Sequence, residues 1–351
     1  MPVFHPHFQP TPTPVSLTRR TLLMGSAAVA PLTGAGAASA ASSASAPRQR
    51  PPYVPYGPRS YFRSRVTGSK VDVEATGRFH EFMASFPEQR GVPYPKINGT
   101  GDNRWGTPWA RGTTAHPVWR VRNIEDNSNP LNRVLRTRGF RAPRWLSDVI
   151  TGTSDSPLCV MDVASGFTVF LTGVDVVGRR LLDVRSAGVT RHASNGLDHR
   201  NQKSNEPRNF TSRGRISDAM VIRRDLVDHG IEHDTDLGHV LHLFLVETSS
   251  AAGARHPMVG AESGKLGFGA EGQRLAVRAD VDLATRRLSP AARVIARTLQ
   301  VRGCYIGDNA GTASALKAEQ ETEDHPVWGR LLHQDSLRDL RWDDFVVLQH
   351  R

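Results

Sequence analysis

Three side chains in the C-terminal half of the chain could transfer protons. His239 opens an apolar segment, His256 precedes a proline in a short loop, and Asp308 follows a further apolar segment. An imidazole titrates near neutral pH and can act as general base or acid on a sugar hydroxyl or a uronate α proton. A carboxylate can orient such a ring. We predict His239, His256 and Asp308 as catalytic residues, with a hydrogen-bonded core position as the alternative for His239. Asp155 is a further candidate acid.

Aromatic and polar side chains concentrate between residues 90 and 150. Their flat rings could stack on pyranose faces while neighbouring polar groups bind hydroxyls. Arginine with aromatics would also suit single-stranded nucleic acid, and packing of loops onto a sheet is a third interpretation. We favour the glycan, because the chain carries an export signal (below), and predict Trp105, Trp109 and Asn309 as substrate-binding residues.

The segment from His229 to His239 holds several imidazoles and carboxylates that could ligate zinc or a related ion. Their spacing matches no closed motif, and Gly230 and Gly238 indicate a loop instead of a helix with both histidines on one face. We interpret the segment as a solvated loop and predict no metal and no cofactor.

Cys159 and Cys304 are the only thiols, and both stand in apolar, strand-like surroundings. We predict two separate buried thiols. A bridge closing a loop of about 145 residues is the alternative, and on the chain-entropy model it would contribute roughly 4–5 kcal/mol.

Short apolar segments alternate with turn residues, as is typical of strands. Residues 160–171 indicate a hairpin that turns at 164–166, and 239–248 and 274–283 indicate strands. In 239–248 the period of two puts His239 and His242 on opposite faces. Helices are expected at 217–228 and at 290–302, where Ser289 is the N-cap and Gly303 the stop. The fold class is therefore all-β, a jelly-roll-like β-sandwich with one or two packed helices.

The N-terminal residues indicate export. Arg19 and Arg20 precede an apolar stretch and a small-residue run that ends at Ala40, which is the order of a twin-arginine signal peptide. We predict a signal peptide at 1–40, a Ser/Ala/Pro-rich tether at 41–60 and one β-sandwich domain at 61–351, with long Trp/Arg-rich loops at about 90–150. The expected partners are the twin-arginine export machinery and a polysaccharide.

The composition is that of a globular chain, with 38% hydrophobic residues among 351 and only 2 Cys. No apolar run reaches the roughly 20 residues of a membrane-spanning helix, so we expect no stable membrane insertion after cleavage. The net charge is +11, but 40 of the 45 basic residues are arginine. This bias is more typical of a GC-rich genome than of a cationic surface, and we predict no nucleic-acid partner.

Residues 150–351 resemble a group of secreted bacterial proteins, most of them without an assigned activity. The likeness rests on GHVLHLFLVET, HPMVGAE, EGQRLAVRADVDL and LSPAARVIARTLQVRGCYIGDNAG, and on the tail HPVWGRLLHQDSLRDLRWDDFVVL. These match in order the group's HALRF, HPA, MGxRxRLKxxxD strand, proline-led helix ending in YG, and ADNG. His239 and His256 match the group's two histidines, and Asp308 matches the Asp of its DNG. Two positions differ: His242 stands where the group usually has arginine, and Cys304 where it often has methionine. The second difference implies that Cys304 fills a core site.

The resemblance implies an extracellular β-sandwich, often from organisms that degrade glycans. We expect a secreted or extracytoplasmic enzyme, a hydrolase or a lyase, that acts on a polysaccharide, an acidic glycan being one candidate. The alternative is a non-catalytic glycan-binding or cell-surface module. The enzyme requires His239, His256 and an acid to meet in one cleft, whereas the binding module requires only exposed rings.

Overall fold

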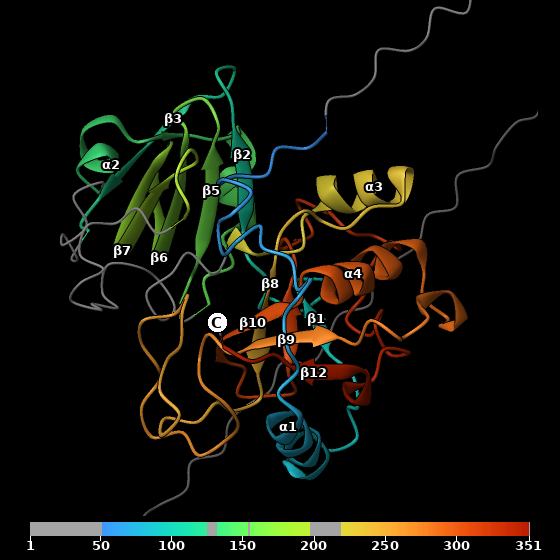
Figure 1. The fold of residues 1–351 in the computed structure, drawn as a ribbon. Helices are drawn as coiled ribbons and strands as arrows, with labels where there is room; N and C mark the ends of the chain where they lie inside the picture. The colour runs from blue at the N-terminus through green and yellow to red at the C-terminus, as the bar shows by residue number, and fades with distance from the viewer. Residues whose placement is uncertain (1–50, 125–131, 154, 197–218, 351) are drawn as a thin grey trace, which may run out of the picture. The chain divides into compact units, whose positions relative to one another are not determined.

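The computed structural model describes residues 51–124, 132–153, 155–196 and 219–350. The expected signal peptide and the first half of the expected tether lie outside these ranges. The described chain forms two six-stranded sheets and four α-helices (Figure 1). Within it no helix is both long and apolar enough to cross a membrane.

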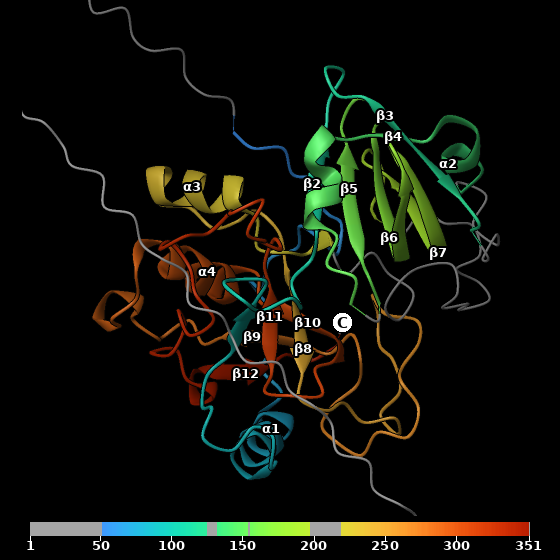
Figure 2. The ribbon, with the colours of Figure 1, turned by 180° about the vertical axis from the view of Figure 1, so that it is seen from behind.

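The first sheet has the strand order β1-β11-β8-β10-β9-β12. Its strands are β1 (Lys96–Asn98), β8 (Leu241–Leu245), β9 (Arg274–Val277), β10 (Cys304–Asn309), β11 (Ala315–Lys317) and β12 (Phe345–Val347). Seen from behind, β11 lies beside β8 (Figure 2). The pairs β1–β11 and β8–β10 are parallel, and the other three are antiparallel.

The second sheet has the order β2-β5-β6-β7-β3-β4. Its strands are β2 (Trp109–Gly112), β3 (Val118–Arg122), β4 (Phe140–Arg141), β5 (Leu158–Asp162), β6 (Phe167–Gly178) and β7 (Leu181–Arg191). The hairpin expected at 160–171 is confirmed as β5 and β6, which are antiparallel. The fold is thus rich in sheet, with two mixed sheets and few helices, and is consistent with a β-sandwich.

Strands β8 and β5 are buried on both faces, and their alternating side chains enter different clusters. In β8, Leu241, Leu243 and Leu245 join a core that includes helix residues, whereas Val240, just before the strand, joins a different cluster. In β5, Leu158 and Val160 belong to the core of the second sheet. Cys159 and Met161 point the other way and share a third cluster with Val240 and Tyr305. This third cluster joins the two sheets.

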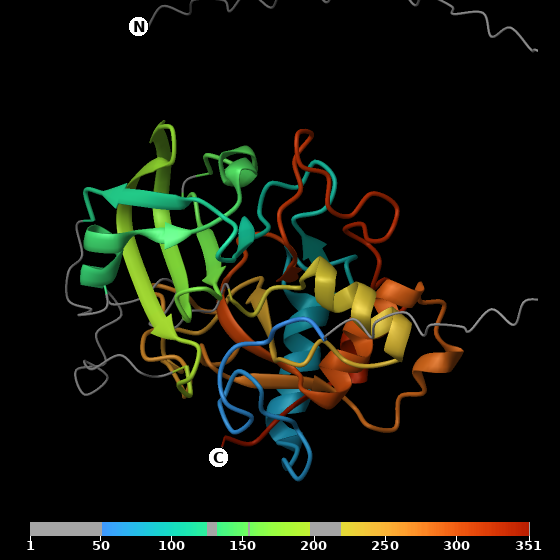
Figure 3. The ribbon, with the colours of Figure 1, turned by 90° about the horizontal axis from the view of Figure 1, so that it is seen from above.

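Helix α4 (Pro290–Val301) begins and ends where the sequence predicts. The Ser289 hydroxyl accepts a hydrogen bond from the Ala292 N–H, Pro290 is the first helical residue, and Gly303 turns the chain into β10 with a φ of 70°. Helix α3 (Arg224–His233) lies beside α4 (Figure 3). Their contact requires Gly230, because a Cβ there would lie 2.6 Å from a methyl group of Val294.

Two further helices were not predicted. Helix α1 (Val73–Ser85) is capped by Asp72 and buries Ala75, Phe79 and Met83, whose spacing of four residues is the signal that reveals it. Helix α2 (Asn132–Arg138) lies in the stretch that we expected to be long loops. That expectation was wrong, since residues 96–149 also hold β1 to β4 and a 3-10 turn at Arg144–Val149.

Other predicted boundaries also shift. The strand expected at 239–248 is confined to Leu241–Leu245, and the one expected at 274–283 ends at Val277. The second half of the expected tether is packed instead of extended. Tyr56 is 4% exposed, and its hydroxyl lies 2.5 Å from that of Thr190 on β7. A buried ring with a satisfied hydroxyl holds this segment on the second sheet.

The residues just before α3 connect the two sheets, because the Ile222 N–H donates to the Lys317 carbonyl of β11 at 2.9 Å and the side chain of Arg223 reaches the second sheet. Arg223 is the buried cation of this connection. Its guanidinium is fully buried, lies 4.5 Å from the ring centroid of Trp109, and donates to the Tyr53 carbonyl at 2.8 Å. It also donates to both carboxylate oxygens of Asp225 and reaches the Met161 sulfur at 3.6 Å. Residues at the start of α3, on β2, on β5 and in the N-terminal segment therefore share one buried cation.

Segments from near the two ends of the described chain meet at β12. Val71 pairs with Leu348, and the Asp72 N–H donates to the Val347 carbonyl at 2.9 Å. In α1, the Nε2 atom of His80 lies 2.9 Å from the Phe345 carbonyl. The first sheet is therefore completed by β12 and held there by α1.

The prediction of two separate buried thiols is confirmed, because Cys159 and Cys304 are both fully buried and no disulfide joins them. They belong to different core clusters. Burial raises the pKa of Cys304 to about 12, so its reactive thiolate is scarce. We expect neither thiol to react with iodoacetamide at pH 8 until denaturant is added, after which mass spectrometry finds two alkylated sites. Rapid labelling of the native protein would contradict this arrangement.

Candidate functional site

A cavity of about 990 Å³ is lined by residues of both sheets and of the loops between them. Its lining is mostly polar and includes both charge signs. Its residues on the first sheet and adjoining loops include Lys96, Asn98, Phe244, Glu262, Lys265, Asp308, Asn309, Lys317 and Gln334. Those from the loop before β2, the second sheet and its loops include Asn103, Arg104, Trp105, Thr153, Asp155, Thr172, Arg185 and Ser186.

Strand alternation determines which face of the first sheet forms the cavity wall. Ile97 of β1 and Leu316 of β11 are paired and belong to the core. Their neighbours Lys96, Asn98 and Lys317 therefore point to the opposite face and line the cavity. Each of these short strands thus supplies core residues on one face and polar cavity residues on the other.

A β-bulge places Asp308 on that same face. Ile306 pairs with Leu243 and points into the core, but the register then shifts, and Asp308 pairs with Phe244. In a regular strand Asp308, two residues after Ile306, would share its core face, and the bulge, which takes up Gly307 as an extra residue, moves Asp308 to the other face. Gly307 is required, because a Cβ there would lie 1.8 Å from Nε2 of His242. The buried imidazole of His242 therefore occupies the space that any other residue at 307 would need.

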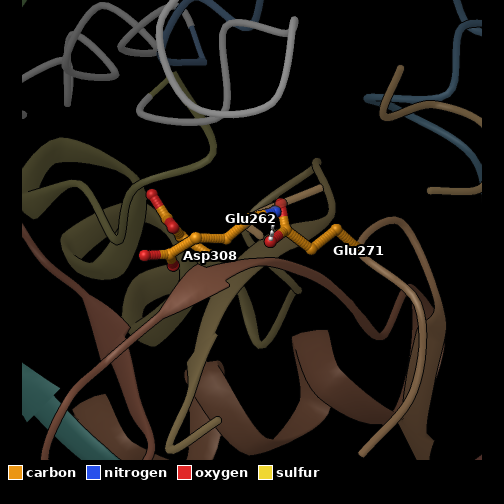
Figure 4. A group of neighbouring side chains, drawn as sticks. All are labelled: Glu262, Glu271 and Asp308. Carbon is orange, nitrogen blue, oxygen red and sulfur yellow. Dashed lines mark hydrogen bonds between the residues drawn. The ribbon is translucent and has the colours of Figure 1, made fainter. Parts of the chain in front are cut away.

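Three carboxylates come together beside the bulge (Figure 4). Glu262, Glu271 and Asp308 each place one oxygen within 4.8 Å of the others. Glu271 is fully buried, whereas Glu262 and Asp308 are half-buried and line the cavity. Carboxylate oxygens are ligands that Ca²⁺ and Mg²⁺ prefer, so this group could hold a cation. The outer two could equally act as an acid–base pair.

Hydrogen bonds hold these carboxylates in place. The Asn309 amide donates to Glu262 Oε2 at 2.5 Å, and its carbonyl oxygen accepts from the Thr248 N–H at 2.6 Å. Glu271 Oε1 accepts from the Glu262 N–H at 3.0 Å. The Lys265 ammonium lies 3.7 Å from Glu262 Oε1. Side chains from β10 and from the loop between β8 and β9 thus form one connected polar network.

Trp105 stands at the cavity with 51% of its surface exposed. Its loop is held by Asn103, whose side-chain oxygen accepts from the Trp105 N–H at 2.9 Å and whose amide donates to Asn98 at 3.0 Å. An exposed ring on a fixed backbone can stack on a flat ligand with little further ordering.

The structure brings together part of the site expected from the sequence. Asp308, Asn309, Trp105 and Asp155 all line the cavity. His239, His256 and Trp109 are not among its lining residues. His256 is exposed, with its ring centroid 6.4 Å from that of Tyr61. Trp109 is almost fully buried beneath the Arg223 guanidinium.

His239 lies in the core. Its ring stacks on Phe62 at 4.8 Å between centroids, and Nδ1 donates to the Val240 carbonyl at 2.9 Å. Burial lowers its pKa to about 3, so the imidazole is neutral at physiological pH. This environment corresponds to the core position that we held as the alternative for His239.

The segment predicted to be a solvated loop is partly helical. His229 and His233 both lie on α3, one turn apart, with ring centroids 4.2 Å apart. The expectation that Gly230 excludes a helix was wrong, because the close contact with α4 needs a glycine at that position. The helix predicted at 217–228 begins instead at Arg224; residues 217 and 218 lie outside the described ranges.

Sequence reasoning did not identify Glu262, Glu271 or Lys317. The two glutamates lie in loops without periodicity, and only the chain path brings them to Asp308. For Lys317 a signal existed, since it alternates with the core residue Leu316. The chain matches no protein-family model, no curated protein and no solved structure.

The bulge gives a stability prediction. Gly307→Ala should lower the free energy of unfolding by about 2–3 kcal/mol, because the new methyl group would overlap the His242 ring. Chemical denaturation would measure it. Gly178→Ala on β6 is the matched control, since a Cβ there meets Leu181 at an ordinary 3.6 Å and the change should stay within about 0.5 kcal/mol. Equal stability of the two variants would contradict the described packing.

Buried His239 gives a pH prediction. Its folded pKa is about 3 and its unfolded pKa near 6.5, so the unfolded chain binds the extra proton first on acidification. This contribution to stability is present above pH 6.5 and is lost as pH falls towards 3, with a slope approaching about 1.4 kcal/mol per pH unit. His239→Gln should flatten the dependence of unfolding free energy on pH between 6 and 4. An unchanged slope would show that His239 is accessible to protons in the folded protein.

Proposed function

We propose that the chain binds a polysaccharide in the cavity and cleaves it with the carboxylates of Glu262 and Asp308. The observation that carries the proposal is the meeting of these two acids at the wall of a large polar cavity that also presents an exposed tryptophan. Two positioned carboxylates on either side of a glycosidic bond are sufficient for acid-catalysed glycosyl transfer.

The spacing of the pair favours one stereochemical course. Retaining glycosidases hold their carboxyl groups about 5–5.5 Å apart, whereas inverting enzymes need roughly 6.5–9.5 Å to admit a water. One oxygen of Glu262 lies within 4.8 Å of one oxygen of Asp308, which is closer to the shorter spacing. One carboxyl group would protonate the leaving oxygen and the other would bond to the anomeric carbon, until water released the sugar. A lyase remains the alternative chemistry.

Neutral polar groups would orient the sugar. The amides of Asn98, Asn103 and Gln334 line the cavity together with the hydroxyls of Thr153, Thr172 and Ser186. Hydroxyl-rich ligands require this mixture of donors and acceptors, and Trp105 supplies the apolar surface on which a pyranose face stacks. Asn309 would act indirectly, by holding Glu262.

Catalytic roles for His239 and His256 stay predictions from the sequence. We assign the reaction to the carboxylates instead, because His239 is fully buried and neither ring lines the cavity. For the same reason we assign the stacking role to Trp105 alone and not to Trp109.

Export remains part of the proposal. It rests on Arg19, Arg20 and the apolar stretch that follows, together with the likeness to secreted bacterial proteins. We propose that the twin-arginine machinery delivers the chain to an extracytoplasmic glycan, and that neither nucleic acid nor membrane is a partner. A jelly-roll-like connectivity also stays a prediction. The two six-stranded sheets favour it, whereas the four parallel pairs depart from the antiparallel pairing of a jelly roll.

A non-catalytic glycan-binding module is the second candidate. The half-exposed Trp105 favours it, since a ring held on an ordered loop is enough for binding. In the enzyme the carboxylates of Glu262 and Asp308 cleave the glycan, whereas in the binding module they only form part of the cavity wall.

The carboxylates can be tested directly. We expect the purified mature chain to release new reducing ends from at least one member of a polysaccharide panel. Glu262→Gln and Asp308→Asn should each lower kcat at least 100-fold, since each removes a proton-transferring or bond-forming group. Both amides can still accept the hydrogen bonds of Asn309, so the melting temperature should move by only a few degrees.

Controls separate the alternatives. Asp324→Asn changes an exposed acid outside the cavity lining and should keep full activity. EDTA should leave turnover unchanged, and loss of activity in EDTA would reassign Glu262, Glu271 and Asp308 to holding a cation. New absorbance from unsaturated uronates would identify a lyase. Binding without turnover would support the glycan-binding module.

A further inference from the structure

Basic side chains reach the cavity from both walls. Lys96, Lys265 and Lys317 belong to the first sheet and its loops, whereas Arg185 belongs to the second sheet and Arg104 to the loop before it. Two of them are committed to acids of the protein. Lys96 bonds to Asp335, and Lys265 pairs with Glu262 at 3.7 Å. Arg104 donates to the Thr151 carbonyl.

Lys317 brings a positive charge close to the carboxylate pair. Its ammonium lies 4.1 Å from the ring centroid of Phe244, and Phe244 is the residue with which Asp308 is in register. The ring belongs to the cavity wall and is 9% exposed, so it holds the ammonium over an apolar surface at the cavity. A charge in such a position interacts more strongly with a ligand than one in open solvent.

Arg185 lies on the opposite wall, on β7. Its side chain crosses the neighbouring strand at Gly173, where a Cβ would lie 2.7 Å from the Arg185 Cβ and 3.3 Å from its Nε. Gly173 has a φ of 58°, so the backbone itself favours glycine there. Arg185 is exposed, and the ion pairs found among the described residues do not include it. A guanidinium binds carboxylates and sulfates through two parallel hydrogen bonds.

We infer that the substrate is an acidic glycan whose carboxylate or sulfate groups bind Lys317 on one wall and Arg185 on the other. This inference rests on the proposed function and names its substrate class. Two cations on facing walls would position a charged chain across Glu262 and Asp308, whereas a neutral glycan offers neither cation an anionic group. Carboxylate and sulfate groups both present negatively charged oxygens, so either could bind the two cations.

Binding measurements on charge-matched probes test the inference. Isothermal titration would use the Asp308→Asn chain, which binds without cleavage, against oligomers of galacturonate, mannuronate, hyaluronan and chondroitin sulfate. Each probe is paired with its carboxyl-reduced or desulfated form. We expect at least one acidic oligomer to bind about tenfold more tightly than its neutral form, with carboxyl reduction and desulfation showing which group is recognised.

Variants locate the effect. Lys317→Gln and Arg185→Gln should each weaken acidic binding about tenfold and leave binding of the neutral form unchanged. The matched controls Lys70→Gln and Arg179→Gln alter basic residues that do not line the cavity and should bind like the parent. Acidic binding that is insensitive to Lys317 and Arg185, or absent from the panel, would overturn the inference.

The two proposals fail in different ways. Cleavage of a neutral glycan that stops in Glu262→Gln would overturn the acidic substrate and leave the carboxylate mechanism standing. Charge-dependent binding with no cleavage of any probe by the unaltered chain would overturn the mechanism and leave anion recognition at Lys317 and Arg185 standing.

Discussion

The cavity exists because two separate sheets are held together, and the buried guanidinium of Arg223 is central to that junction. A cation removed from water must keep its partners, since breaking a buried ion pair commonly costs about 3–5 kcal/mol. Here the partners come from the N-terminal segment, β2, β5 and the start of α3. The Ile222 N–H next to Arg223 donates to the Lys317 carbonyl on β11 at 2.9 Å, so the same short segment contacts both the second sheet and the wall that carries Lys317. The apolar cluster around Cys159, Val240 and Tyr305 adds area to the same junction.

Within one wall, a single inserted glycine determines what chemistry the surface can offer. In β10, Cys304 and Ile306 pack in the core, whereas Asp308 and Asn309 line the cavity. The bulge at Gly307 separates these two parts of the strand. The packed imidazole of His242 fixes the bulge. Two buried histidines of the described chain therefore contribute through packing: His242 supports the position of Asp308, and His239 fills the core against Phe62. The acids face the cavity and carry the proposed reaction.

The parts of this structure that sequence could predict are those set by neighbouring residues. Ser289, Pro290 and Gly303 mark α4 by local capping, and alternation in residues 241–245 separates the leucines from His242. The cluster of three carboxylates could not be predicted, because Glu262 and Glu271 lie in loops and only the path of the chain brings them to Asp308. Period-two counting from Ile306 would even place Asp308 in the core. Trp109 was predicted to bind substrate, but its ring is buried against the Arg223 guanidinium. The sequence alone does not distinguish an exposed aromatic near arginines from a buried partner of one of them.

The strand order of the first sheet has a consequence for synthesis of the chain. Its strands begin at residue 96 and end at 347, and β9 lies between β10 and the last strand, β12. Such distant pairings form slowly, whereas the hairpin-connected strands β5, β6 and β7 are local and can form early. A ribosome-bound chain in which β12 has not yet emerged presents the unpaired edge of β9 and the uncovered apolar face of α1. Sheet edges of this kind template aggregation. Strand β12 therefore protects the nascent protein against self-association, and the interval before β12 emerges is when a chaperone is most needed.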